Sequence, residues 1–198
     1  MVVTLGELFE TKNGYTPSKA NRSFWEGETD IPWFRMEDIR ENGRILDDAA
    51  QHVTRAAVKG SPFPADSIII STSATIGEHA LIRVPSLANQ RFTYLMIREE
   101  YRAAVDMRYL FYYCFRLGDY CREHLNQGNF ASVDMGKFNE FTFLIPPLKE
   151  QQRIVSILDR FDTLCNDLSS GLPAEIEARK KQYEYYRDKL LTFKELKA

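Results

Sequence analysis

The sequence is poor in the features that mark several common protein classes. It has three cysteines among 198 residues, and Cys114, Cys121 and Cys165 lack the spacing of a zinc site or a disulfide framework. No apolar run approaches the roughly 20 residues that a membrane-spanning helix needs. The first ten residues, MVVTLGELFE, have neither the basic start nor the apolar middle of a signal peptide. These absences predict a cytoplasmic protein without a metal site and without membrane contact.

A strong excess of one charge is also missing. The formal net charge is −2, and neither the first 146 residues nor the remainder is markedly basic. A chain with this balance binds nucleic acid only through a local patch, or beside a partner that supplies more positive charge.

Motifs of catalysis are absent as well. The sequence contains no phosphate-binding loop of the Walker type, no GxGxxG, no nucleophile elbow and no Asn/Asp-Pro-Pro-aromatic motif. The three histidines, His52, His79 and His124, are scattered, as in ordinary core or solvated positions. We therefore expect a non-catalytic protein.

What is present predicts an α+β fold. Residues 1–146 switch between strand-like and helix-like periodicity, which is typical of a mixed α/β domain. Short β-branched or aromatic runs predict strands at 31–35, 67–71, 80–84, 92–98 and 141–145. Helical patterns predict a capped turn at 5–9 and helices at 54–59, 107–117, 119–125 and 133–138.

Residues 147–198 form a long, charged helical region. Two prolines end the last strand, and Pro147 suits the first helical position. Apolar residues then recur at spacings of three and four, and a second stripe follows the interruption at 169–173; the two stripes predict a partner interface at Ile154, Phe161, Leu164, Leu168, Ile176, Tyr183 and Leu190. One straight helix of this length would measure roughly 75 Å. Periodicity alone allows either a projecting coiled-coil arm or a hairpin folded at Gly171.

Three loops combine glycine with small hydroxyl and amide side chains, at 14–22, 71–77 and 126–132. Glycine lets the backbone approach a ligand closely, and hydroxyls and amides suit phosphate oxygens and base edges. Taken with nearby cations, the loops give a set of candidate DNA contacts: Thr16, Ser18, Lys19, Arg22, Ser73, Thr75, Arg91, Gln127, Asn129 and Lys137.

The order of several short motifs resembles one family, the specificity subunits of type I restriction-modification systems. The opening of their target-recognition domain is similar to GYTPS at 14–18, FWEG at 24–27 and IPW at 31–33. A second signature resembles SATIG at 73–77 and NQ at 89–90. The junction into the family's helical region is similar to IPPLKEQ at 145–151, and the far end of that region to residues 171–191.

The resemblance implies a DNA sequence-reading subunit without its own catalysis or cofactor. Residues 1–146 would be the target-recognition domain, and residues 147–198 the helical spacer and dimerisation region. Partner modification subunits would bind S-adenosylmethionine and methylate adenine, and a motor-nuclease subunit would cleave double-stranded DNA. Since family members usually carry two recognition domains, this chain is either a half subunit that forms a homodimer or a fragment.

The resemblance also favours a projecting arm, kinked near Pro173, over a hairpin. A homodimer of identical halves would read an interrupted palindrome, because both domains see the same bases. The alternative from another class is a coiled-coil adaptor whose α/β head binds protein, which the nearly neutral head allows.

Overall fold

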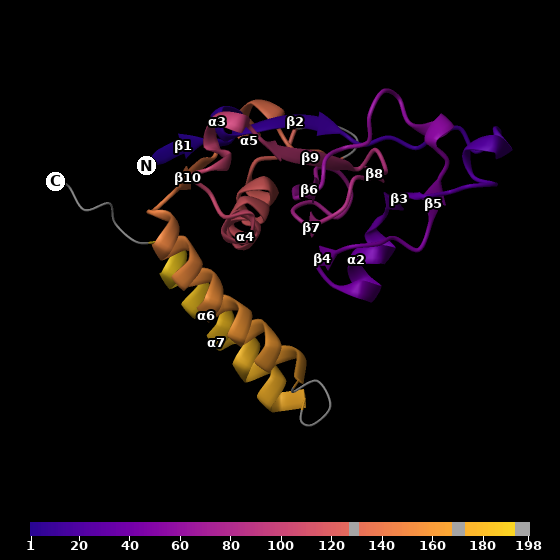
Figure 1. The fold of residues 1–198 in the computed structure, drawn as a ribbon. Helices are drawn as coiled ribbons and strands as arrows, with labels where there is room; N and C mark the ends of the chain where they lie inside the picture. Colours follow the sequence, from indigo (N-terminus) through magenta and orange to yellow (C-terminus); the bar gives the residue numbers. More distant parts are fainter. Residues whose placement is uncertain (127–130, 168–172, 193–198) are drawn as a thin grey trace.

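The computed structural model describes residues 1–126, 131–167 and 173–192 (Figure 1). Its centre is a five-stranded sheet, in which all neighbouring strands are antiparallel except the parallel pair β7–β4. In spatial order the strands are β2 (Phe9–Asn13), β9 (Phe92–Ile97), β6 (Ser67–Ser71), β7 (His79–Ile82) and β4 (Ile45–Leu46).

Both faces of this sheet are covered, which explains why β6 is apolar along its middle. Ile68 and Ile70 point into the larger core, while Ile69 between them points into a second core on the opposite face. Successive side chains of a strand alternate between faces, so a strand buried on both sides has no polar positions to alternate with. The strand predicted at 67–71 is confirmed, and its burial on both faces explains its apolar run.

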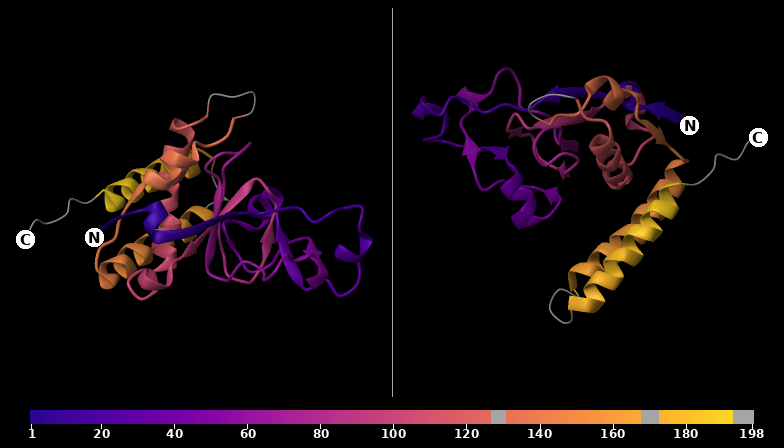
Figure 2. Two further views of the ribbon diagram at one scale, coloured as in Figure 1. Left: turned by 90° about the horizontal axis from the view of Figure 1, so that it is seen from above. Right: turned by 180° about the vertical axis from the view of Figure 1, so that it is seen from behind.

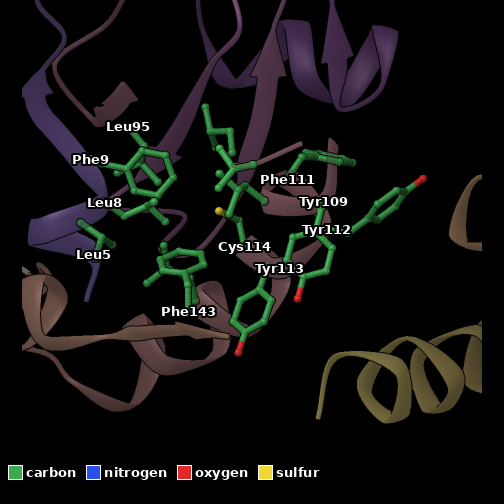
Figure 3. Close-up of a cluster of buried hydrophobic side chains, with 14 of the residues drawn as sticks. Leu5, Leu8, Phe9, Leu95, Tyr109, Phe111, Tyr112, Tyr113, Cys114 and Phe143 are labelled. Atoms are coloured by element: carbon green, nitrogen blue, oxygen red, sulfur yellow. The ribbon is translucent and has the colours of Figure 1, made fainter. Parts of the chain in front are cut away.

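The larger core lies between the sheet and helix α4 (Met107–Glu123), and Figure 3 shows its aromatic side chains. Helices α1 (Leu5–Leu8) and α5 (Met135–Glu140) close the same core at one end, with α3 (Glu99–Arg102) beside them. Thr4 caps α1 through a capping box with Glu7, as the sequence predicts for this turn. The two helices predicted at 107–117 and 119–125 are one helix, because Gly118 continues α4 without a break.

The smaller core lies on the opposite face of the sheet. It joins the sheet to helix α2 (Met36–Asn42) and to a three-stranded sheet with the order β5 (His52–Val53), β3 (Ile31–Phe34) and β8 (Leu87–Ala88). Two short 3-10 helices, η1 (Arg22–Phe24) and η2 (Arg55–Ala57), contact each other at its edge. The helix predicted at 54–59 is therefore a single 3-10 turn.

A two-stranded ribbon leads into the helical region. Strand β1 (Val2–Thr4) pairs with β10 (Thr142–Leu144), and the amino terminus donates a hydrogen bond to the carbonyl of Ile145. Pro146 and Pro147 then end the strand. The carbonyl of Pro147 accepts the first helical hydrogen bonds, so helix α6 (Leu148–Asp167) begins one residue later than predicted.

The helical region is an antiparallel hairpin that projects from the head (Figures 1 and 2). Helix α7 (Pro173–Leu191) returns along α6, and the ring of Phe161 stacks on Tyr186 with centroids 5.9 Å apart. The expectation of a kinked arm rather than a hairpin is wrong. Phe161 of the first apolar stripe therefore has its aromatic partners, Tyr183 and Tyr186, within the same chain.

The predicted interface residues are consequently distributed between the inside and the outside of this hairpin. Ile154 is buried in the larger core, and Tyr183 and Leu190 pack against that core. Leu164 is 48% exposed. Ile176 lies in α7, and Leu168 falls outside the described residues. The α+β fold class with a long helical arm is confirmed.

Candidate nucleic-acid interface

The first predicted loop is joined to the turn between β8 and β9. The hydroxyl of Thr16 donates to Oε1 of Gln90 at 2.6 Å, and the amide of Tyr15 donates to the carbonyl of Ala88 at 2.8 Å. Gly14 makes this approach possible, since a Cβ there would lie 2.4 Å from the Ala88 carbonyl oxygen. Gln90 belongs to the sequence motif at 89–90 but is not among the DNA contacts predicted from the sequence.

The same turn is joined to the second and third loops. The amide of Thr72 donates to the carbonyl of Arg91 at 3.0 Å, and the amide of Val133 donates to the carbonyl of Thr72 at 3.0 Å. Ser73 pairs with Ser132 in an isolated β-bridge. Backbone hydrogen bonds therefore link segments from all three predicted loops into one continuous edge of the head, which we call the loop edge: residues 14–16, 72–75, 89–91 and 132–133.

The β6–β7 loop within this edge has a tightly specified conformation. The hydroxyl of Ser71 donates to the carbonyl of Ser73 at 2.7 Å, and the amide of Gly77 donates to the carbonyl of Ser71 at 2.9 Å. Ala74 and Gly77 adopt positive φ angles of 63° and 87°. These contacts hold the backbone around Thr75 in a compact turn at the surface.

The remaining candidates lie at different distances from the loop edge. Ser18, Lys19 and Arg22 belong to the segment after Thr16, where the indole of Trp25 donates to the carbonyl of Ser18 at 3.1 Å. Lys137 lies on α5 and pairs with Glu140 at 2.8 Å, and this hydrogen bond raises the pKa of the lysine. No hydrogen bond between described residues joins Lys137 to the loop edge. Gln127 and Asn129 fall outside the described residues.

Three cations of this region have no ion-pair partner, as is also true of Arg40 and Lys149 elsewhere in the described chain. The side chains of Lys19, Arg22 and Arg91 are exposed and form no ion pair with any described residue. Arg102 and Arg153, by contrast, each pair with a glutamate three residues earlier on the same helix. Cations without an internal partner are available to an external anion such as a phosphate.

Other kinds of site find little support. Among residues 1–126, 131–167 and 173–192, no cluster of histidine, cysteine or acidic side chains has a metal-binding arrangement. No helix in that described part is long and apolar enough to cross a membrane. A cavity of about 390 Å³ lies between the head and the arm, lined by residues that include Arg44, Phe111, Phe115 and Tyr183. None of the residues that line this cavity belongs to the three polar loops.

Comparisons with known proteins agree with the motif order. A family model described as the type I restriction modification DNA specificity domain matches residues 1–178. The chain is 54% identical over 199 residues to the type I restriction enzyme EcoprrI specificity subunit of Escherichia coli, which covers 96% of the chain and 49% of that relative. It is 40% identical to the EcoR124I/EcoR124II specificity subunit of Escherichia coli, covering 96% and 48%.

Solved structures show the same fold at low sequence identity. The HsdS subunit from Thermoanaerobacter tengcongensis superimposes with a TM-score of 0.65 at 17% identity, covering 96% of this chain and 44% of that one. A chain from a type I R-M system complex gives a TM-score of 0.66 at 18% identity, covering 96% and 45%. The present chain thus spans about half the length of the relatives it matches, and it belongs to the family of type I restriction modification DNA specificity domains.

Proposed function

We propose that this chain reads one part of a DNA target for a type I restriction-modification complex. The observation that carries the proposal is the loop edge, where polar loops from three regions of the sequence meet beside cations that have no internal partner. Residues 1–146 form the target-recognition part in this proposal. Thr16, Ser73, Thr75 and Arg91 contact DNA there, together with Ser18, Lys19, Arg22, Gln127, Asn129 and Lys137.

Catalysis belongs to partner subunits in this proposal. Modification subunits that bind S-adenosylmethionine methylate the DNA, and a motor-nuclease subunit cleaves it. The helical hairpin offers these partners a docking surface. The predicted alternative of a protein-binding adaptor receives no support from the relatives, which are specificity subunits.

A complete target needs a second recognition unit, and we propose that two copies of this chain can supply it. Because Phe161 packs against Tyr183 and Tyr186 of α7 in the same chain, such a dimer uses exposed surfaces of the hairpin, for example around Leu164. Two identical units related by a two-fold axis would read an interrupted palindrome.

Methylation mapping tests the proposal directly. The chain is co-expressed with its modification subunit in a methylation-free host, and the modified bases are sequenced. We expect one interrupted motif, symmetric for two copies of this chain and asymmetric if a different recognition domain joins it. Methylation without any shared motif, or none at all, would refute sequence reading by this chain.

Substitutions then test two of the proposed DNA contacts, Arg91 within the loop edge and Arg22 outside it. With duplexes carrying the mapped motif, Arg22→Ala and Arg91→Ala should each weaken binding by ~1–3 kcal/mol. Arg102→Ala is the matched control, since Arg102 is an exposed arginine outside the edge that pairs with Glu99. Equal affinities for all three variants and the unchanged chain would remove these residues from the interface.

A further inference from the structure

The β6–β7 loop rests directly on helix α4 through two glycines. A Cβ on Gly77 would lie 2.6 Å from the carbonyl oxygen of Gly118, and a Cβ on Gly118 would lie 2.7 Å from the carbonyl oxygen of Gly77. Real Cβ atoms do not approach backbone oxygens this closely. Glycine in the middle of a helix is unfavourable for the helix itself, so the close approach of the loop is the structural reason for Gly118.

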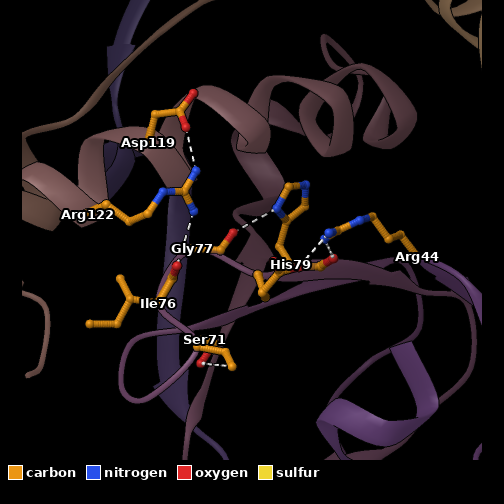
Figure 4. Close-up of polar contacts among 9 residues, drawn as sticks. Arg44, Ser71, Ile76, Gly77, His79, Asp119 and Arg122 are labelled. Atoms are coloured by element: carbon orange, nitrogen blue, oxygen red, sulfur yellow. Dashed lines mark hydrogen bonds and ion pairs between the residues drawn. The ribbon is translucent and has the colours of Figure 1, made fainter. Parts of the chain in front are cut away.

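Arg122, one turn further along α4, binds the backbone of the same loop. Its guanidinium donates to the carbonyl of Ile76 at 3.1 Å and forms an ion pair with Asp119 (Figure 4). Asp119 and Arg122 are three residues apart on one face of the helix, so the carboxylate orients the guanidinium toward the loop. An arginine that binds a carboxylate and a backbone carbonyl at once fixes the position of that carbonyl.

The far end of the loop is held by separate contacts. His79 is buried, and its Nδ1 lies 3.2 Å from the carbonyl oxygen of Gly77. Arg44 donates to the carbonyl of His79 at 3.1 Å and pairs with Glu78. Side chains of Arg122, His79 and Arg44 thus hold the backbone carbonyls of Ile76, Gly77 and His79. At the other end of the loop, Ser73 is held by its β-bridge to Ser132, and Ala74 and Thr75 lie between these two fixed ends.

We propose that Gly118 and Arg122 are positioning residues for sequence recognition: they hold the β6–β7 loop against α4 so that Ser73 and Thr75 meet the DNA in one conformation. The inference rests on the proposed function only for what the loop contacts. A loop that is already ordered loses less conformational freedom when it binds, and it discriminates more sharply between bases. Neither residue touches DNA in this scheme.

Hydrogen exchange of the free protein tests, without DNA, whether Gly118 and Arg122 hold the β6–β7 loop in place. Arg122→Ala and Gly118→Ala should speed exchange of the amides of Gly77 and Glu78 by about tenfold or more, because fewer contacts then hold their hydrogen bonds to the carbonyls of Ser71 and Thr75. Two controls match the chemistry. Arg102→Ala removes an arginine with the same spacing to its acid, and Gly6→Ala adds a methyl whose nearest neighbour would be 3.5 Å away. If the exchange rates are unchanged in both test variants, Gly118 and Arg122 do not hold the β6–β7 loop in place.

Recognition is tested with the methylation assay and with duplexes carrying the mapped motif. Arg122→Ala should weaken binding about tenfold, which corresponds to ~1.4 kcal/mol, and should relax base preference at one position of the motif. The slope of affinity against salt should stay as in the unchanged chain, because no phosphate contact is lost. A slope reduced by about one would instead identify Arg122 as a phosphate contact and refute the positioning role.

The two levels of the proposal fail in different ways. If the unchanged chain directs no motif-specific methylation, the proposed function fails while the exchange result still stands. If the unchanged chain does direct it and both variants keep the same motif and affinity, the positioning role fails. Arg122→Lys should restore part of the binding, since an ammonium can still donate to the Ile76 carbonyl. Should Gly118→Ala fail to fold, Arg122→Ala and Arg122→Lys decide the question.

Discussion

At the scale of single residues, His79 occupies an apolar site inside the head. It is buried on β7 against the rings of Phe111 and Phe115, at centroid distances of 5.5 Å and 4.5 Å. Burial lowers its pKa to about 3, with a smaller contribution in the same direction from Arg44. Its Nε2 has no hydrogen-bond partner among the described residues. The fold therefore requires the neutral imidazole.

This burial predicts a pH dependence of stability with a definite sign. The pKa of His79 is about 3 in the folded state and near 6.5 in the unfolded state, so the unfolded chain takes up the proton first as the pH falls. Stability should decrease from pH 6.5 downwards, by about 2 kcal/mol at pH 5 from this group alone. Urea unfolding at pH 7.5 and pH 5 measures the loss.

Two histidine variants separate this contribution from the rest of the protein. His79→Gln should show a smaller stability loss between the two pH values, because it cannot be protonated. His124→Gln leaves His79 in place and should keep the full loss. The same pH dependence in both variants would exclude His79 as its source.

At the scale of elements, aromatic contacts hold the hairpin together. The ring of Phe161 on α6 lies between Tyr183 and Tyr186 of α7, with centroid distances of 6.4 Å and 5.9 Å. Phe161→Ala should lower the free energy of unfolding by about 1–2 kcal/mol, through lost ring contacts and lost burial. Leu164→Ala, on the same helix but 48% exposed, should change it by less than about 0.5 kcal/mol.

The same position distinguishes contacts within the chain from contacts between copies. Phe161→Asp should loosen the hairpin and speed amide exchange along both of its helices, while the molar mass from light scattering stays the same. A halved mass would place the ring in an interface between two copies.

Which elements the sequence predicts depends on how local their signals are. The β-branched run of β6 and the capping box of α1 are visible in a few neighbouring residues, and both are present. Strand β2, with the sequence FETKN, was missed because four of its five residues are polar and only its pairing with β9 makes it a strand. The spacing of three and four left the hairpin and the projecting arm equally open, because it shows that a helix needs a partner but not which helix that is, and the family resemblance then favoured the arm.

The candidate site divides in the same way. Glycine, hydroxyl and amide composition predicted the three loops. Their junction depends on contacts such as Thr16 with Gln90, 74 residues apart, which no local pattern contains. The contact between α4 and the β6–β7 loop had one local signal in the sequence. Gly118 is a glycine inside an otherwise strong helix, which indicates that another segment approaches the helix closely there.

At the scale of the whole molecule, a buried glutamine joins the head to the arm. Gln151 is fully buried at the start of α6. Its Oε1 accepts from the amide of Asp106 at 2.8 Å, and its Nε2 donates to the carbonyls of Ala104 and Pro146 at 2.9 Å and 2.8 Å. Two turns further along α6, Asp159 accepts from Arg108 and Tyr112 of α4, each at 2.6 Å. These two connections fix the direction of α6 relative to the head.

Replacing Gln151 by methionine keeps the volume of the side chain but removes all three hydrogen bonds. The backbone groups of Ala104, Asp106 and Pro146 lose their partner, so Gln151→Met should cost about 2 kcal/mol in the free energy of unfolding. The neighbouring Gln152 is exposed, and Gln152→Met should cost less than about 0.5 kcal/mol. Urea unfolding of the two variants gives the comparison.

The same pair of variants tests whether the junction sets the geometry of DNA reading. If the arm holds two recognition units at a fixed separation, a loosened junction lets that separation vary. One base pair extends the duplex by about 3.4 Å. Under co-expression with the modification subunit, Gln151→Met should therefore add methylated motifs whose spacer is one base pair longer or shorter. Gln152→Met should keep the single spacer. If Gln151→Met folds, loses the predicted stability and still methylates only the original spacer, the separation is set elsewhere, and Asp159 with its two partners on α4 becomes the next position to test.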